Sequence, residues 1–440
     1  MLKSKERRNE FVRKTKTKAI GIMCLVLVLA VTLIVGGCAK EVPPTPPPTP
    51  PPTEPAPGAG EPIQMGRLCT LTGPIASTIL PSDEAIIDYW KYVNDEKGGI
   101  LGHPVELTTY DTSYAMDKYM KGYKLMAAKN PVCIFYENSG CTNTMKWMFE
   151  RDHIVGFAMS TGAKMYPPTW LFFVNPGYAE GYIGFAKFLK KEWDKEHPGV
   201  TPKWGWCTWD NSTGKGPLRM TRWLEENGWE YTSTQYIPFA PVDTTTQLKT
   251  LHDQGTNFVA CNIGDAAESI VLKDAERLGY LKDMKFLGTH YTAQQALVEE
   301  AGAAAAEGFS SWDCWPLPTM MDVPGIKLMN EISQKYRGHP LQQKMGVGST
   351  AEAVIVEEAL KRCLEKGIWP VTGDDLKESL ESMKDWDPMG LAAKVTFSPE
   401  EHNLRYAYAA RIVNGKMVKI SDWTYCPKLS YEEYKPGTYE

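Results

Sequence analysis

The chain has 440 residues and a formal net charge of −5 at pH 7. This length exceeds one typical domain, so two lobes are expected. The first 37 residues carry eight basic and two acidic side chains, which leaves a net charge of −11 on the remainder. Such an acidic body argues against nucleic-acid binding and against a polybasic membrane-binding surface.

The chain begins with a basic segment that is followed by an apolar run over 19–35. A signal-peptide core usually has about 7–15 apolar residues and a membrane span about 20. The run therefore fits either a cleaved leader or an uncleaved transmembrane anchor. It ends in Val35-Gly36-Gly37-Cys38, which resembles a bacterial lipobox, and the small residues before the cysteine favour cleavage. We predict a signal peptide over 1–37, lipidation of Cys38, and an extracytoplasmic chain that is anchored to a membrane.

A segment dominated by Pro, Thr and Ala covers residues 41–62. It cannot bury apolar surface and favours polyproline II, which rises about 3.1 Å per residue. We predict that 38–62 form a lipid-anchored stalk beneath a globular body. No apolar run after the stalk approaches the length of a membrane span.

Eight cysteines follow the stalk, namely Cys69, Cys133, Cys141, Cys207, Cys261, Cys314, Cys363 and Cys426. None stands in a C-x-x-C pair and the histidines are scattered, so the sequence gives no support for a metal site. Disulfides are permitted outside the cytoplasm. Cys133 and Cys141 either bridge a strand–loop connection or are small buried apolar residues.

The body then alternates between strands and helices. Strands are expected at 65–71, 104–110, 132–136 and 154–158, with helices at 117–129 and around 145–150 between the later ones. The first helix is expected to open at Asp83, because apolar residues recur after it near every 3.6 positions, and to stop at Gly98-Gly99. This alternation predicts a mainly parallel, doubly wound α/β sheet, whose ligands bind beyond the carboxyl ends of the strands.

A second series of the same kind follows. Helices are expected at 181–191, 218–227, 244–254 and 265–278, and strands at 204–208, 232–237, 258–261 and 285–287, with a glycine-punctuated loop at 209–216. Two successive α/β series predict two similar lobes with a ligand site between them.

Several segments resemble one known family. Gly98-Gly99-Ile100-Leu101-Gly102-His103-Pro104-Val105-Glu106-Leu107, followed by Tyr110-Asp111, resembles a signature of the branched-chain-amino-acid-type substrate-binding proteins of ABC transporters, which have the type I periplasmic binding fold. Shorter segments resemble the family in the family's order: Leu71–Pro74, Asp243–Leu248, Lys273–Gly279, Glu307–Phe309 and Gly415–Val418. The likeness covers roughly residues 64–423.

The resemblance implies two lobes that are joined by three crossovers. Lobe 1 is expected at 63–178 and 317–398, and lobe 2 with the tail at 179–316 and 399–440. Residues 310–318 would then form a hinge strand.

In that family the first lobe binds a ligand carboxylate or amide through hydroxyl groups and through backbone N–H groups at helix starts, where a partial positive charge lies. The matching positions are Ser139, Gly140, Ser160 and Thr161, and Ser77 is a further candidate. Ordinary helix capping is the alternative for each of these residues.

The resemblance implies that the second lobe closes over the ligand with Trp209, Thr213, Asn262, Asp265, His290 and Tyr291. Trp209 either stacks on a ligand or packs in the core, and Asp265 either holds a cationic group or caps a helix. Amino-acid-binding members have an acidic residue near the position where this chain has Thr289-His290-Tyr291. This departure favours a bulkier or less charged ligand, such as an aromatic acid or an amide, over an amino acid.

The sequence gives little support for catalysis. Gly346–Ala351 fits the pattern G-x-G-x-x-A but follows no convincing strand, so we interpret it as the entry to a helix over 351–364. No nucleophile elbow and no P-loop occur, and no cofactor is expected. We predict a solute-binding lipoprotein that delivers a small polar ligand to ABC permease and ATPase subunits. A ligand-sensing subunit that signals to a receptor and a cell-surface hydrolase are the alternatives.

Overall fold

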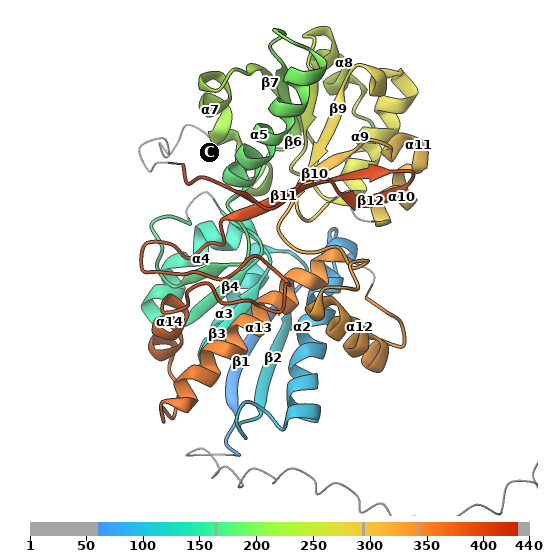
Figure 1. Ribbon diagram of the computed structural model, residues 1–440. Coiled ribbons are helices and arrows are strands. Elements are labelled where there is room, and N and C mark those ends of the chain that lie inside the picture. Colours follow the sequence, from blue (N-terminus) through green and yellow to red (C-terminus); the bar gives the residue numbers. More distant parts are fainter. Residues whose placement is uncertain (1–59, 163–164, 293–294, 342, 430–440) are drawn as a thin grey trace, which may run out of the picture. The chain divides into compact units, whose positions relative to one another are not determined.

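The computed structural model describes residues 60–162, 165–292, 295–341 and 343–429. The predicted signal peptide, Cys38 and the stalk up to residue 59 lie outside the described residues, as does the tail at 430–440. The described residues form two β-sheets with helices packed against them (Figure 1). Within these ranges no helix combines the length and the apolar character that a membrane span requires.

The first sheet contains five parallel strands in the order β2-β1-β3-β4-β5. The strands are β1 (Ile63–Cys69), β2 (Val105–Asp111), β3 (Cys133–Tyr136), β4 (Val155–Ala158) and β5 (Leu171–Phe173). The first four are connected by α2 (Ala76–Lys97), α3 (Met116–Ala127) and α4 (Ser139–Asp152). The parallel, doubly wound arrangement that the alternating pattern predicted is confirmed.

Side chains of β1 alternate between the two faces of this sheet, as the period of a strand requires. Leu68 faces α3, because a Cβ on Gly122 of that helix would lie 2.7 Å from Leu68 Cδ2. Arg67 faces the opposite side and donates a hydrogen bond to Asp83 of α2. The second face therefore encloses a buried charged group beside its apolar contacts.

The second sheet contains eight strands. They are β6 (Lys203–Trp209), β7 (Glu230–Ile237), β8 (Phe258–Ala260), β9 (Lys285–Gly288), β10 (Ser310–Asp313), β11 (Tyr406–Val413), β12 (Lys416–Lys419) and β13 (Thr424–Tyr425). β7, β6, β8, β9 and β10 are neighbours in that order and run parallel, whereas β11 is antiparallel to β10, β12 and β13. β11 and β12 form a hairpin, and the segment Gly415–Val418 that resembles the family lies at its turn and in β12.

In the described part of the chain, seven helices accompany this sheet: α5 (Tyr178–Glu196), α6 (Ser212–Lys215), α7 (Thr221–Glu226), α8 (Thr245–Asp253), α9 (Asp265–Leu278), α10 (Gln295–Ala301) and α11 (Ala303–Ala306). Short 3₁₀ turns lie at η1 (Gly216–Met220) and η2 (Tyr280–Lys282). The segment predicted as one loop over 209–216 contains α6. The bounds of α9 are those predicted from the sequence.

The chain passes between the two sheets three times, after β5, after β10 and before β11. Between the second and third passages it forms α12 (Pro324–Arg337), α13 (Lys344–Glu365) and α14 (Gly373–Glu381), and α13 packs along α2 (Figure 1). The three crossovers agree with the predicted fold. We call the first sheet with α2–α4 and α12–α14 lobe 1, and the second sheet with its helices lobe 2. The residue bounds given above for the lobes remain predictions.

Helix α2 begins earlier than the sequence indicated. The pattern predicted a start at Asp83, whereas the helix begins at Ala76 and contains Pro81. The Asp83 carboxylate is fully buried and accepts hydrogen bonds from Arg67 Nε at 2.6 Å and from Thr70 N at 2.7 Å. Asp83 is thus a counter-ion in the core rather than a helix cap, and the prediction for its role was wrong.

The glycines of the G-x-G-x-x-A segment lie inside α13, which begins at Lys344 rather than at 351. A Cβ on Gly348 would collide with Met159 Sδ and would lie 2.7 Å from the ring of Trp315. The absence of a side chain at Gly348 therefore permits close approach of α13 to two neighbours.

All eight cysteines of the described residues are buried free thiols. Cys133 begins β3 and Cys141 lies in the first turn of α4, so the two stand at opposite ends of the strand and form no bridge. Among the residues that the structure describes, no group of three or more His, Cys, Asp and Glu side chains is arranged to hold a metal ion.

Candidate functional site

Ten of the eleven predicted ligand residues lie at the carboxyl ends of parallel strands. In lobe 1, Ser139 and Gly140 begin α4 after β3, and Ser160 and Thr161 follow β4. In lobe 2, the residues are Trp209 at the end of β6, Thr213 in α6, Asn262 after β8, Asp265 at the start of α9, and His290 and Tyr291 after β9. Ligands of open α/β sheets bind at this edge.

Ser77 does not belong to this group. It is exposed in the first turn of α2 and lines a cavity of about 220 Å³ between α2, α12 and α13. A role for Ser77 in ligand binding stays a prediction.

Residues from the two lobes contact one another at the strand ends. Thr213 Oγ1 lies 3.4 Å from Ser139 Oγ, which in turn lies 3.1 Å from the hydroxyl of Tyr178. Asn262 Nδ2 donates to the carbonyl of Thr213 at 2.6 Å. A continuous set of hydrogen bonds thus joins lobe 2 to the start of α4 in lobe 1.

Helix capping does not explain these positions. The N-cap of α4 is Asn138, whose side chain accepts from Cys141 N at 3.1 Å, so Ser139 is the first helical residue. The N-cap of α9 is Gly264, and Asp265 again lies within the helix. The capping alternative is therefore wrong for both Ser139 and Asp265.

His290 forms a second contact between the lobes. Its Nε2 lies 3.4 Å from the carbonyl of Met159 in lobe 1 and 3.3 Å from Asn175 Nδ2. Burial, with the charge of Lys344 as a smaller cause, lowers the pKa of His290 well below its usual value. The imidazole is therefore neutral near pH 7 and donates or accepts hydrogen bonds without carrying charge.

Aromatic side chains meet beside these polar contacts. The ring of Trp209 packs against Phe239 of lobe 2 with centroids 4.4 Å apart, and Phe239 lies 6.3 Å from Tyr114 of lobe 1. Tyr178 packs near His290 and Tyr291. Trp209 is thus packed against another ring, and the group offers aromatic faces on both sides of the boundary between the lobes.

Three buried polar atoms at the strand ends have no hydrogen-bond partner among the described residues. They are Thr161 Oγ1 in lobe 1 and Trp209 Nε1 and Asn262 Oδ1 in lobe 2. An unsatisfied buried polar group costs about 1–3 kcal/mol, and such groups in native proteins are nearly always partnered by protein or ordered water. Their gathering indicates that water or a ligand completes the hydrogen bonding here.

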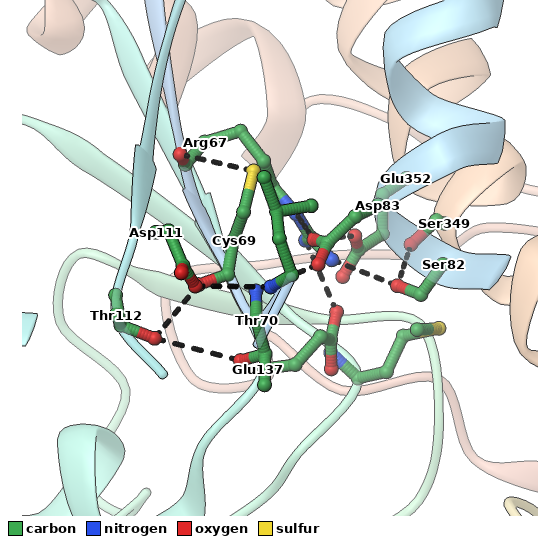
Figure 2. A network of polar contacts seen from close by, with 12 residues as sticks. Arg67, Cys69, Thr70, Ser82, Asp83, Asp111, Thr112, Glu137, Ser349 and Glu352 are labelled. Atoms are coloured by element: carbon green, nitrogen blue, oxygen red, sulfur yellow. Dashed lines mark hydrogen bonds and ion pairs between the residues drawn. The ribbon is translucent and has the colours of Figure 1, made fainter. Parts of the chain in front are cut away.

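A buried charged network lies beneath the lobe 1 side of the site (Figure 2). Arg67 Nε donates to Asp83 Oδ1 at 2.6 Å and Nη2 to Ser82 Oγ at 2.8 Å. Nη1 lies 3.3 Å from Glu137 Oε1 and 4.0 Å from Glu352 Oε2. The network therefore joins β1, α2, the end of β3 and α13 around one guanidinium.

Glu137 connects this network to the candidate ligand residues. Its Oε2 accepts from Met159 N at 3.2 Å and from Ser160 Oγ at 3.5 Å, while Oε1 faces Arg67. Burial raises the pKa of Glu137 to about 7, although the guanidinium of Arg67 opposes the shift. Burial and the charge of Glu137 likewise raise the pKa of Glu352 well above its ordinary value.

Sequence reasoning missed Glu137, Tyr114, Tyr178 and Phe239. Glu137 follows β3 directly, so the strand-end argument that selected Ser139 also applied to it. Tyr178 begins α5 after the crossover from β5, and no periodic pattern indicates that it approaches α4. Tyr114 and Phe239 stand in loops, where their pairing depends on how the two lobes meet.

The two lobes, the three crossovers and the facing strand ends define a type I periplasmic binding fold. The sequence matches a family described as "Periplasmic binding protein" over residues 62–416. The chain belongs to this family of solute-binding proteins, and membership implies a location outside the cytoplasm. No curated protein matches the sequence.

Solved structures with the same fold are numerous. The chain is 22% identical to a branched chain amino acid ABC transporter protein from Thermus thermophilus that was crystallised with bound valine, with a TM-score of 0.74 over 82% of this chain and 96% of that one. It is 20% identical to a fatty acid ABC transporter substrate-binding protein from Thermomonospora curvata, with a TM-score of 0.72 over 86% and 95% of the two chains. An ABC transporter substrate binding protein from Aeropyrum pernix is 16% identical, with a TM-score of 0.74 over 83% and 96%.

Proposed function

We propose that this protein is a lipid-anchored solute-binding protein that captures a small polar ligand between its lobes and delivers it to an ABC importer. The observation that carries the proposal is the convergence of ligand candidates from both lobes, with the unpartnered polar atoms of Thr161, Trp209 and Asn262 among them. A ligand at this position would complete their hydrogen bonds, which gives binding a direct energetic reason.

Binding of this kind operates through lobe closure. A ligand that contacts both lobes favours the closed arrangement by its differential affinity for that state. The contacts of Thr213 with Ser139 and of His290 with Met159 join the lobes in the present arrangement. Opening would break both contacts, so an importer could distinguish the loaded form from the empty one.

The fold and the predicted signal peptide both support delivery of the ligand to an ABC importer. The similar solved structures named above are proteins of ABC transporters. A lipid on Cys38 would hold the protein at the membrane and raise its local concentration near a permease. The lobe bounds at 63–178 with 317–398, and at 179–316 with 399–440, are part of this proposal.

Thermal-shift measurements against amines, amides, carboxylic acids, amino acids and ureas test the proposal. At least one compound should raise the melting temperature with concentration, because a ligand that binds only the folded state stabilises it. A Ser160→Ala/Thr161→Ala double variant should lose the shift, whereas Ser77→Ala should keep it. A broad library without any shift, or a shift that survives in the double variant, contradicts the assignment.

A further inference from the structure

The donors at the end of β4 are already occupied by a carboxylate of the protein itself. Met159 N–H and the Ser160 hydroxyl both point to Glu137 Oε2, at 3.2 and 3.5 Å. Backbone N–H groups and hydroxyls at a strand end are the groups that would otherwise receive a ligand anion. Glu137 is 1% exposed, so its carboxylate fills this position from within the fold.

The position of Glu137 brings it to the boundary between the lobes. The hydroxyl of Tyr178 interacts with both Ser139 and Ser160, and Thr213 of lobe 2 reaches the same Ser139. Ser160 therefore links Glu137 to Tyr178, and Tyr178 contacts the same Ser139 that Thr213 of lobe 2 reaches.

Acidic side chains outnumber basic ones around these residues, although burial raises the pKa of Glu352 and of Glu268 well above its ordinary value and so reduces the charge that these two carry. On the lobe 1 side, the single guanidinium of Arg67 faces the three carboxyl groups of Asp83, Glu137 and Glu352. On the lobe 2 side, α9 opens with Asp265 and Glu268, both buried, and Glu268 forms no ion pair with a described residue.

Among the described residues, two buried cations already have acidic partners. Lys344 is buried against Asp313, and Arg219 lies 2.5 Å from Glu180. Neither of these two described cations is therefore left to pair with a second anion at the strand ends, where that anion would meet the like charge of Glu137, which is unfavourable in a buried site.

Aromatic side chains lie beside these acidic groups. The rings of Tyr114, Phe239 and Trp209 pack in a row that spans both lobes, and the rings of Tyr178 and Tyr291 pack against His290. Ring faces attract cations, and the attraction grows when both groups are removed from water. Acidic groups and aromatic faces together are suited to an organic ammonium.

We propose that Glu137 sets the charge selectivity of the site, so that the protein binds a ligand with a cationic nitrogen and an apolar body and without a carboxylate. The inference rests on the proposed function. Glu137 acts in two ways: it blocks the donors at Met159 and Ser160 from a ligand anion, and it supplies the negative potential that stabilises an ammonium. A ligand of this class differs both from the amino acids of the resembling family and from the aromatic acids and amides that the departure at Thr289-His290-Tyr291 favoured.

Calorimetry with matched probes tests the proposal. The triplet 2-phenylethylamine, 3-phenylpropanoate and 3-phenylpropanamide, and the aliphatic triplet isopentylamine, 4-methylpentanoate and 4-methylpentanamide, vary the head group on a constant body. At pH 8, where Glu137 is mostly ionised, the amines should bind at least tenfold more tightly than the acids and amides. Equal or tighter binding of the acids or amides overturns the charge selectivity and leaves the solute-binding function intact. If no member of either triplet binds while another compound of the thermal-shift library does, the charge selectivity alone is overturned, and only a library without any ligand contradicts the solute-binding function as well.

Glu137→Gln should weaken amine binding at least tenfold and reduce the ratio between the affinities for the amine and for the acid. Glu352→Gln is the matched control, because Glu352 lies in the same buried network and makes no contact with Met159 or Ser160; it should keep the selectivity of the parent. Unchanged selectivity in a folded Glu137→Gln protein would reduce Glu137 to a structural support of its loop. Should that variant fail to fold, the probe series on the parent protein still decides the matter.

Discussion

Arg67 shows how much structure a single buried charge requires. Its guanidinium is 0% exposed, and a buried ion is tolerated only when hydrogen bonds and opposite charges replace its hydration. Asp83, Glu137 and Ser82 supply direct contacts, and Glu352 completes the enclosure. Three carboxylates around one guanidinium would leave excess negative charge, and burial raises the pKa of Glu352 well above its ordinary value, which favours the protonated form of this carboxyl.

The buried carboxyl at Glu352 should make stability depend on pH. Because its pKa is raised above the ordinary 4.5, the folded state keeps a proton that the unfolded chain releases above about pH 4.5, and the free energy of unfolding falls as pH rises through that region. Glu137, whose pKa is about 7, contributes in the same direction between pH 4.5 and 7. The side chain of a Glu352→Gln variant does not titrate in the folded or the unfolded state. Urea unfolding should therefore give a larger free energy of unfolding for the variant than for the parent at pH 8, and nearly the same value for both at pH 4.5.

The control for this measurement is Glu365→Gln, which changes an exposed carboxyl on the same helix. It should retain the pH dependence of the parent. A Glu352→Gln protein that is less stable than the parent at pH 8 would show that Glu352 is ionised in the fold and pairs with Arg67.

At the scale of elements, the predicted helix bounds were correct where the apolar residues recur at helical spacing. They were wrong where tertiary contacts decide the position of polar residues. Helix α9 has the bounds 265–278 that its pattern indicated, because its apolar residues recur regularly and Gly279 ends it in the left-handed conformation. The start of α2 was misplaced because Pro81, Ser82 and Asp83 have the composition of a helix start. Contacts with Arg67 and with Ser349 of α13 use these polar residues inside the helix instead.

The close approach of α13 to its neighbours gives an element-scale prediction. In an isolated helix, alanine is favoured over glycine by about 1 kcal/mol. Gly348→Ala should nevertheless destabilise the protein by about 1–3 kcal/mol, because the added Cβ would collide with Met159 Sδ and press on Trp315. Urea unfolding would measure the change, with Lys361→Ala on the half-exposed face of α13 as the control. A stabilised Gly348→Ala protein would show that the neighbours relax freely.

At the scale of the whole molecule, the alternation of strands and helices was sufficient to predict two α/β lobes with mainly parallel sheets, whereas the three crossovers were implied by the family resemblance. The contacts between the lobes were not predictable in the same way. Tyr114 and Phe239 belong to loops of different lobes, and their stacking depends on the angle between the lobes. Glu137 was missed for a related reason: its partners Arg67 and Met159 come from separate strands, so its role follows only from the assembled sheet.

The present contacts between the lobes also predict where closure can be trapped. A Cβ on Gly264, the N-cap of α9 in lobe 2, would lie 3.7 Å from Thr78 Oγ1 on α2 in lobe 1. This separation is close to what a disulfide between two cysteines requires. Neither residue is among the ligand candidates, but the added Cβ at position 264 would also lie 3.2 Å from the ring of Trp209. A Thr78→Cys/Gly264→Cys protein should still bind ligand when reduced, and the Gly264→Cys single variant measures the effect of the Trp209 contact on affinity. With oxidised glutathione the double variant should form an intramolecular disulfide, and a ligand found by thermal shift should speed this reaction by populating the closed state.

The oxidised protein should release that ligand more slowly than the reduced protein, and each single variant should be insensitive to oxidant. Crosslinking at the same rate with and without ligand would mean that ligand does not shift the lobes toward the closed arrangement.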